Sequence, residues 1–321
     1  MALRYYPKPS LEDFIKQCTP LAIIDSLEQE FRERVGAITA ALLNFEPSGN
    51  PVDNLSNFLK ADADFLGVIL SITNLSQEKF LRILSAERFA KHDYNPEWTI
   101  DMVHRKIRDE PGFVERIALL FLEGRNSAVL VQHVAGFYLD QLGLPTNWDY
   151  IVRDPQPVQN VIRRKLTGEY TDAKGDAIED IMRKHLDMLE AKYGISHGKG
   201  QVKLVGKEVD HALPSVDEPY ILIMSSYMET TGSGQTARAN EQSDMFSTVQ
   251  KDNVRYGTKR VFVNFVDGAG WLARRSDLRK MYDGCDHIVN LKTLDRLEAI
   301  ICKYVPDKFF VHGSRPEIVE G

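Results

Sequence analysis

The spacing of apolar residues changes after about residue 168, and this change constrains the fold more than any other feature of the chain. Before it, apolar residues recur every three or four positions, as Leu27, Phe31 and Val35 do in the segment 21–45. After it, short apolar runs of strand length alternate with amphipathic segments. The sequence therefore predicts a helical N-terminal region followed by an α/β region.

The first region predicts several helices separated by turns rich in Pro, Gly and Asn, with no fixed repeat that would indicate a solenoid. Besides 21–45, the expected helices cover the segments 53–74, 76–92 and 126–144. We place the domain boundary so that residues 1–165 form a mainly helical domain and residues 166–321 form the α/β domain.

The second region predicts the order α-β-β-β-α-β-α-β-α, which is a mixed sheet with helices packed on it. It opens with an amphipathic helix over 172–194, with Ile178, Ile181 and Met182 on its apolar side. The expected strands are 201–206, 207–214, 220–228, 259–268 and 286–291, and the later helices are 236–250, 274–284 and 293–305.

Composition is that of a soluble globular protein, with 43% hydrophobic and 27% charged residues. No apolar run approaches the roughly 18–20 residues that a membrane span needs, and the N-terminus has no apolar signal core. Three cysteines without metal-type spacing indicate reduced thiols and a cytoplasmic location. A net charge of −6 argues against non-specific coating of nucleic acid but allows a specific DNA enzyme.

Asp210 is the first candidate for chemistry, because strands disfavour carboxylates unless these meet solvent or a metal at a strand end. A surface strand with alternating charges is the plain alternative. Glu229 follows the next strand, and two adjacent strands joined by a short loop would bring the two carboxylates together.

Glu241 is the second candidate, because it lies four residues before Met245 and eight before Val249 in the helix 236–250. This spacing predicts that Glu241 faces the sheet. A buried carboxylate needs a partner or a metal. Arg238 or a hydroxyl of the preceding loop is one option, and a cation shared with Asp210 is the other. Glu179 is a weaker candidate, since an ion pair with Arg183 explains it equally well.

Together these carboxylates predict a Mg²⁺ site suited to phosphodiester hydrolysis, because Mg²⁺ prefers oxygen ligands. The sequence has no Cys/His cluster for zinc and no phosphate-binding loop of the G-x-x-x-x-G-K-[ST] type.

The order of elements, with Asp210 on the second strand and carboxylates around the third, resembles the PD-(D/E)xK nuclease core. The segment 259–301 and the "SGQTARANEQ" stretch are similar to the C-terminal parts of Type II restriction endonucleases. Two motifs depart from the family: Val209 replaces the usual proline, and neither Met224-Ser225-Ser226 nor Glu229-Thr230-Thr231 ends in lysine.

The resemblance implies a Type II site-specific deoxyribonuclease that hydrolyses double-stranded DNA with Mg²⁺, within a restriction-modification system. The implied metal ligands are Asp210, Glu241 and Glu229, with Lys207 or Gln235 in the role of the missing lysine. The alternatives are a structure-specific or repair nuclease on the same core, and a non-catalytic DNA-binding protein.

DNA contacts are expected from polar residues that flank Glu241 and from a basic pair further on. They are Arg238, Asn240, Gln242, Arg274 and Arg275. The helical domain would serve recognition, act as a lid or form a dimer. Cleavage of both strands of a symmetric site implies a homodimer, and a restriction enzyme implies a cognate methyltransferase.

Overall fold

The computed structural model describes residues 2–311 and 315–321. The chain divides into two compact units. The helical unit is Asp25–Tyr170, and the α/β unit combines Met1–Ile24 with Thr171–Gly321. The first 24 residues thus pack with the α/β unit, whereas the sequence pattern had grouped them with the helices.

The helical unit is built from short amphipathic helices whose starts are fixed by side-chain caps. Asn50, Ser76 and Thr99 each accept hydrogen bonds from the first turn of the helix that follows. The helices are α2 (Asp25–Leu43), α3 (Pro51–Ala61), α4 (Phe65–Ile72), α5 (Gln77–Ala90), α6 (Ile100–Asp109), α7 (Phe113–Glu123), α8 (Gly136–Leu139), α9 (Asp149–Arg153) and the first part of α10 (Pro155–Tyr193).

Two expectations for this unit were wrong in detail. The single helix expected over 53–74 is divided into α3 and α4, because the chain is extended at Asp62. The segment 126–144 forms only α8 and the 3-10 turns η1 (Gly124–Asn126), η2 (Leu130–Gln132) and η3 (Asp140–Leu142). Glycines and β-branched valines lower helix propensity in that segment.

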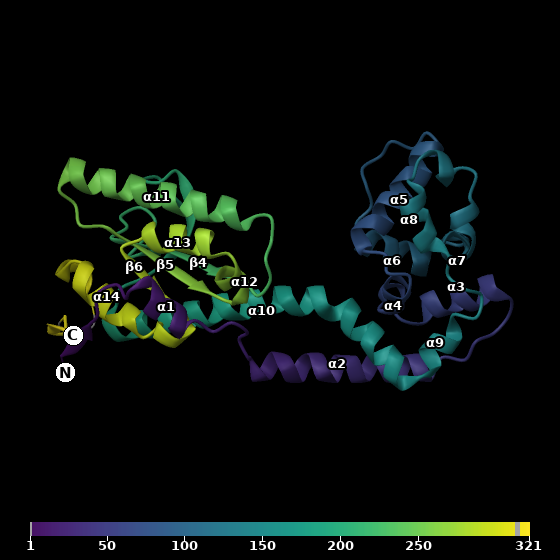
Figure 1. Ribbon diagram of the computed structural model, residues 1–321, viewed down its shortest axis with the longest axis horizontal. Coiled ribbons are helices and arrows are strands. Elements are labelled where there is room, and N and C mark those ends of the chain that lie inside the picture. Colours follow the sequence, from purple (N-terminus) through teal and green to yellow (C-terminus); the bar gives the residue numbers. More distant parts are fainter. Residues whose placement is uncertain (1, 312–314) are drawn as a thin grey trace. The chain divides into compact units, whose positions relative to one another are not determined.

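The α/β unit is organised around a mixed five-stranded sheet in the order β2-β3-β4-β5-β6 (Figure 1). The strands are β2 (Gly198–Val202), β3 (Lys207–Leu213), β4 (Ile221–Tyr227), β5 (Val261–Asp267) and β6 (His287–Val289). The pairs β2/β3 and β3/β4 are antiparallel, and β4, β5 and β6 run parallel. The predicted order of strands and helices is confirmed.

Helices cover both faces of this sheet (Figure 1). On one face, α10 and α14 (Arg296–Tyr304) bury residues such as Ile178 and Leu297 against Ile223. On the other, α11 (Gln235–Tyr256) and α13 (Arg275–Asp283) bury Val249 and Leu278. The short α12 (Ala269–Ala273) and the 3-10 turns η4 (Leu291–Thr293) and η5 (Asp307–Phe309) complete the unit. Ile181, expected on the apolar side of α10, is 38% exposed.

The N-terminal residues are held to the α/β unit at three places. Strand β1 (Leu3–Tyr5) pairs in parallel with β7 (Ile318–Glu320), and α1 (Leu11–Gln17) contributes Phe14 to the core beside α13. The buried carboxylate of Asp267, at the end of β5, accepts backbone hydrogen bonds from Thr19 at 2.6 Å, Gly268 at 2.9 Å and Leu291 at 3.1 Å. Three amide donors offset part of the cost of burying this carboxylate, and burial still raises the pKa of Asp267 above its ordinary value.

Candidate functional site

Asp210 lies in the middle of β3 and lines a cavity of about 260 Å³. Its Oδ2 accepts a hydrogen bond from the backbone N–H of Ser225 on β4, at 2.7 Å. The wall opposite the sheet comes from α10. The full lining is Asp176, Glu179, Asp180, Arg183, Lys199, Asp210, His211 and Ser225.

A β-bulge between β2 and β3 explains how two consecutive residues of β3 line one cavity. Gly198 pairs with Ala212 and Gly200 pairs with Val209, so Asp210 and His211 together lie opposite the single residue Lys199. Val209 and Ala212 both pack on the α11 side of the sheet, which strict alternation along a strand would forbid. Bulges of this kind commonly re-aim side chains beside active sites.

The acidic side chains of α10 come from one stripe of the helix, because residues three and four apart share a face. Lys199 connects this stripe to β3. Its Nζ lies 3.9 Å from Asp210 Oδ1 and 3.9 Å from Glu179 Oε2. Asp180 forms an ion pair with Lys184, whose Nζ lies 2.6 Å from Asp180 Oδ2. The cavity therefore holds a lysine between two carboxylates, and two further carboxylates, Asp176 and Asp180, line it.

The imidazole of His211 forms the buried side of this cavity. It is 8% exposed, and burial, together with nearby His197 and Lys199, lowers the pKa of His211 to about 4. His211 is therefore neutral at physiological pH. Its Nδ1 has no hydrogen-bond partner among the described residues.

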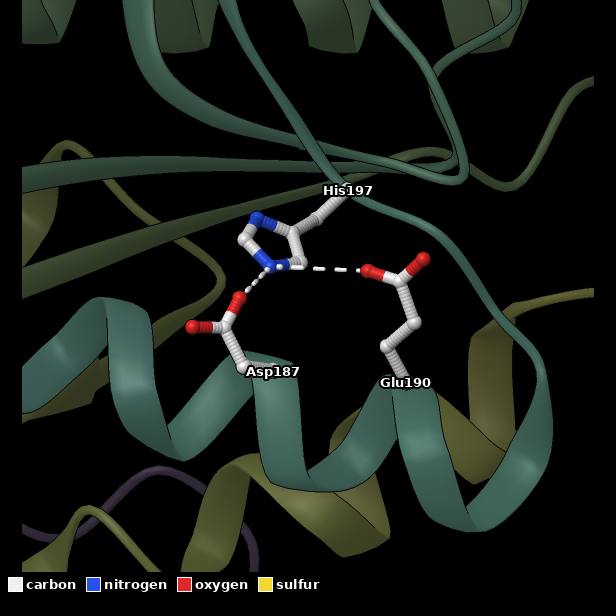
Figure 2. Close-up of side chains that lie close together, drawn as sticks. All are labelled: Asp187, Glu190 and His197. Atoms are coloured by element: carbon white, nitrogen blue, oxygen red, sulfur yellow. Dashed lines mark hydrogen bonds and ion pairs between the residues drawn. The ribbon is translucent and has the colours of Figure 1, made fainter.

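A second group of side chains lies beside His211, at the end of α10. Figure 2 shows Asp187 and Glu190 projecting from the helix towards the ring of His197. The Nε2 of His197 is 2.9 Å from Asp187 Oδ1 and 3.7 Å from Glu190 Oε2. The rings of His197 and His211 meet edge to face, with centroids 5.5 Å apart.

Glu229 does not line the Asp210 cavity. The Oε1 atom of Glu229 accepts two hydrogen bonds, from the ammonium of buried Lys174 at 2.9 Å and from the hydroxyl of Tyr227 at 2.6 Å. Tyr227 in turn accepts a hydrogen bond from the Ala22 backbone. The contacts of Glu229 join α10, β4 and the N-terminal segment.

Glu241 does not face the sheet, contrary to the expectation. It is exposed and pairs with exposed Lys207 at 3.0 Å. The buried stripe of α11 instead consists of Gln235, Ala239, Gln242, Met245 and Val249. Counting back in steps of four was the error, because eight residues at 3.6 per turn rotate a position about 80° from the starting direction.

The remaining predicted residues have separate positions around α11. Gln235 is buried, and its Oε1 accepts a hydrogen bond from the Gly232 backbone at 3.1 Å. Arg238 donates to Ser226 Oγ at 3.1 Å, and Asn240 accepts a bond from Lys280 at 2.6 Å. Gln242 is only 1% exposed, so in this structure its amide is not accessible to a base edge.

Of the predicted pair Arg274 and Arg275, the side chain of the first makes contacts within the protein and that of the second faces solvent. Arg274 donates to the Gly232 carbonyl at 2.9 Å and pairs with Asp277. Arg275 is exposed at the start of α13.

Lys199, Asp176 and Asp180 are cavity residues that the sequence interpretation missed. Strand β2 was expected to begin at 201, but it begins at Gly198. Glycines on either side of Lys199 weakened the strand pattern, so the lysine was not assigned to the sheet. If the strand had been extended back to residue 198, Lys199 would have fallen opposite Asp210 of the neighbouring strand, and this position would have identified it as a candidate.

All three cysteines are buried and free. Across residues 2–311 and 315–321, every helix is too short or too polar to cross a bilayer.

The family described as DpnII restriction endonuclease matches residues 48–299 of the chain. No curated protein and no solved structure matches the chain significantly.

Proposed function

The chain belongs to the DpnII restriction endonuclease family and is a Type II restriction endonuclease, which hydrolyses double-stranded DNA; from this premise we propose that the Asp210 cavity is its active site. The observation that carries the proposal is the position of Lys199, 3.9 Å from both Asp210 and Glu179. Carboxylates that can hold a metal ion, with a lysine beside them that can stabilise developing negative charge, suit metal-assisted phosphodiester cleavage.

The donor set suits a Mg²⁺ ion, but the carboxylates would have to close on it, because among the described residues only Asp187, Glu190 and His197 bring three ligand atoms within 4.8 Å of one another. Asp176, Glu179 and Asp210 offer only oxygen ligands, and the exposed rim leaves room for the waters that Mg²⁺ retains. When bound, the ion polarises the phosphate and stabilises the leaving oxygen. The sequence-based set of ligands was Asp210, Glu241 and Glu229; the proposal keeps Asp210 and replaces the other two with Glu179 and Asp176.

The residues around the cavity have separate roles in this proposal. The Ser225 N–H fixes the Asp210 carboxylate, so that Oδ1 faces the cavity. Lys199 Nζ donates a hydrogen bond to the attacked phosphate or to the water beside it, which compensates the negative charge that grows in the transition state. Neutral His211 closes the inner wall and adds no charge there.

The proposed core is a PD-(D/E)xK core in which the lysine has moved. Support comes from the order of the elements, with Asp210 on the second strand of the sheet and an acidic helix before it. The lysine comes from β2, across the bulge from Asp210. This change would account for the absence of lysine after the third strand, where Met224, Ser225 and Ser226 stand.

The proposal also includes the DNA contacts, the dimer and the partner methyltransferase that the sequence led us to expect. Exposed Arg275 and Lys251 are suited to phosphate contacts, which position a duplex without reading its sequence. A two-fold dimer would match a symmetric cleavage site. A restriction enzyme of this kind would act in the cytoplasm with a cognate methyltransferase that protects host DNA.

The decisive experiment is a digest of unmethylated phage DNA with Mg²⁺ or with EDTA, by the wild-type protein and by Asp210→Asn. We expect discrete fragments that require Mg²⁺, and a loss of cleavage of about a thousandfold or more in the variant, because several kcal/mol of transition-state stabilisation depend on the ion. Unchanged cleavage by Asp210→Asn would refute the site. A metal-dependent smear would indicate a nuclease without site specificity, and binding without cleavage would indicate a non-catalytic protein.

Lys199→Ala tests the displaced lysine separately. We expect kcat to fall by about 10²–10³-fold with little change in KM, because the lysine acts on the transition state. Lys207→Ala is the matched control, since Lys207 pairs with Glu241 outside the cavity. Loss of cleavage in the Lys207 variant alone would transfer the role to that lysine.

A further inference from the structure

The group of Asp187, Glu190 and His197 contains an imidazole, which distinguishes it from the all-oxygen cavity around Asp210. Its ligand atoms, one from each residue, all lie within 4.8 Å of one another. Imidazole is a ligand that zinc, nickel and copper ions favour, whereas Mg²⁺ selects oxygen. The two carboxylates are three residues apart on α10, so they point to the same side of the helix.

The spacing of these atoms fits an ion of zinc type. A tetrahedral ion with bonds of about 2.0–2.1 Å places its ligands roughly 3.3 Å apart. The distances from His197 Nε2 to the two carboxylate oxygens are 2.9 Å and 3.7 Å, on either side of that value. An ion would therefore need only small side-chain movements to replace the present hydrogen bonds.

Burial adds an independent indication. The His197 side chain is 10% exposed, while those of Asp187 and Glu190 are 51% and 44% exposed. The ligands thus form a site closed on the imidazole side and open to solvent on the carboxylate side. Next to it, His211 is 92% buried and has an Nδ1 atom without a partner among the described residues. Buried polar atoms normally have a partner, and a hydrated ion beside His197 would bring water to this nitrogen.

We propose that Asp187, Glu190 and His197 bind a transition-metal ion of zinc type, separate from the Mg²⁺ of the active site. The ion has a structural task, because it joins the last turns of α10 to the start of β2. Lys199 follows His197 by two residues on that strand. Binding therefore holds in register the segment that carries the proposed catalytic lysine.

The test measures metal binding and stability, so it does not depend on DNA cleavage. Full-length Asp210→Asn protein, stripped with chelator, would be titrated with Zn²⁺ and with Co²⁺, whose visible absorption reports tetrahedral nitrogen and oxygen ligands. We expect one ion per chain and a higher melting temperature in Zn²⁺, because an ion that binds only the folded state stabilises it. The Asp210→Asn background weakens the active-site cavity as a source of the signal, and the His197 variant below separates the two sites.

The same titration with His197→Asn added should show at least a hundredfold weaker Zn²⁺ binding, since even changes outside the first ligand shell weaken metal sites by about 10–100-fold. His92→Asn is the matched control; His92 is an exposed histidine with a positive φ of 59°, which asparagine tolerates. Equal affinities in these two variants would overturn the proposal, as would Zn²⁺ binding at millimolar concentration only. If His197→Asn does not fold, Glu190→Gln on the open side of the site replaces it under the same criteria.

Discussion

The two units differ in the polar side chains they bury: among the described residues, completely buried polar side chains occur only in the α/β unit. The core of the helical unit is built on aromatic contacts, such as Phe58 stacked on Phe65 with ring centroids 4.3 Å apart. The α/β unit fully buries Asn264, Asp267 and Asn290 as well as its apolar core. Apolar packing is non-directional, whereas buried polar groups require particular partners. The difference indicates that the α/β unit is the one built to hold loops and strand ends in fixed positions.

The largest effect on stability is expected from the aromatic core of the helical unit. Phe58→Ala should lower the free energy of unfolding by about 3–5 kcal/mol, because the side chain is fully buried and its removal leaves a cavity. Denaturant unfolding monitored by circular dichroism measures the change. Phe89→Ala, at a position 55% exposed in the same unit, is the control. Equal losses in both variants would show that this core is not as closely packed as described.

A smaller effect, dependent on pH, is expected in the α/β unit. Burial lowers the pKa of His287 to about 4, from an ordinary value of 6.5. Below pH 6.5 the unfolded chain binds a proton that the folded chain does not, so stability falls until the pH reaches about 4. Between pH 7.5 and pH 5 this histidine should remove about 2 kcal/mol from the free energy of unfolding.

His287→Asn should remove that part of the pH dependence, whatever its effect on stability at pH 7.5. Guanidinium unfolding at both pH values measures the difference. His133→Asn, an exposed position in the helical unit, should leave the pH dependence as in the wild type. An unchanged difference between the two pH values in His287→Asn would contradict the assignment.

The smallest effect is expected from Glu241. Glu241→Gln breaks only an exposed ion pair with Lys207, so the free energy of unfolding should change by less than about 0.5 kcal/mol. Cleavage should change by less than about fivefold, because an exposed pair contributes ~0–1 kcal/mol. A digest beside Asp210→Asn makes the comparison. A loss as large as that of Asp210→Asn would move the catalytic site to α11.

The sequence was sufficient for the order of elements in the α/β unit, because strand-length apolar runs and amphipathic helices have different periods. It was also sufficient to identify Asp210 as unusual within a strand. The residues that surround Asp210 could not be predicted in the same way. Lys199 is brought opposite Asp210 by a bulge, and a bulge changes the register without leaving a regular pattern in the sequence.

The error at Glu241 has a different origin. Glu241 directly precedes Gln242, which belongs to the buried stripe, and the stripe contains two glutamines. Polar residues in a buried stripe weaken the apolar signal from which the phase of a helix is inferred. The interpretation therefore relied on Met245 and Val249 alone. Extrapolating from Val249 over eight residues gave the wrong direction for the Glu241 side chain.

The pairing of β1 with β7 has a consequence for the synthesis of the protein. These strands cover residues 3–5 and 318–320, so nearly the whole sequence lies between them. On the ribosome, the helical unit is complete while most of the α/β unit is still unmade, and domains generally fold as they emerge. Strand β1 therefore has no partner strand until β7 is made, whereas α1 and Thr19 can pack as soon as α13 and the end of β5 are present.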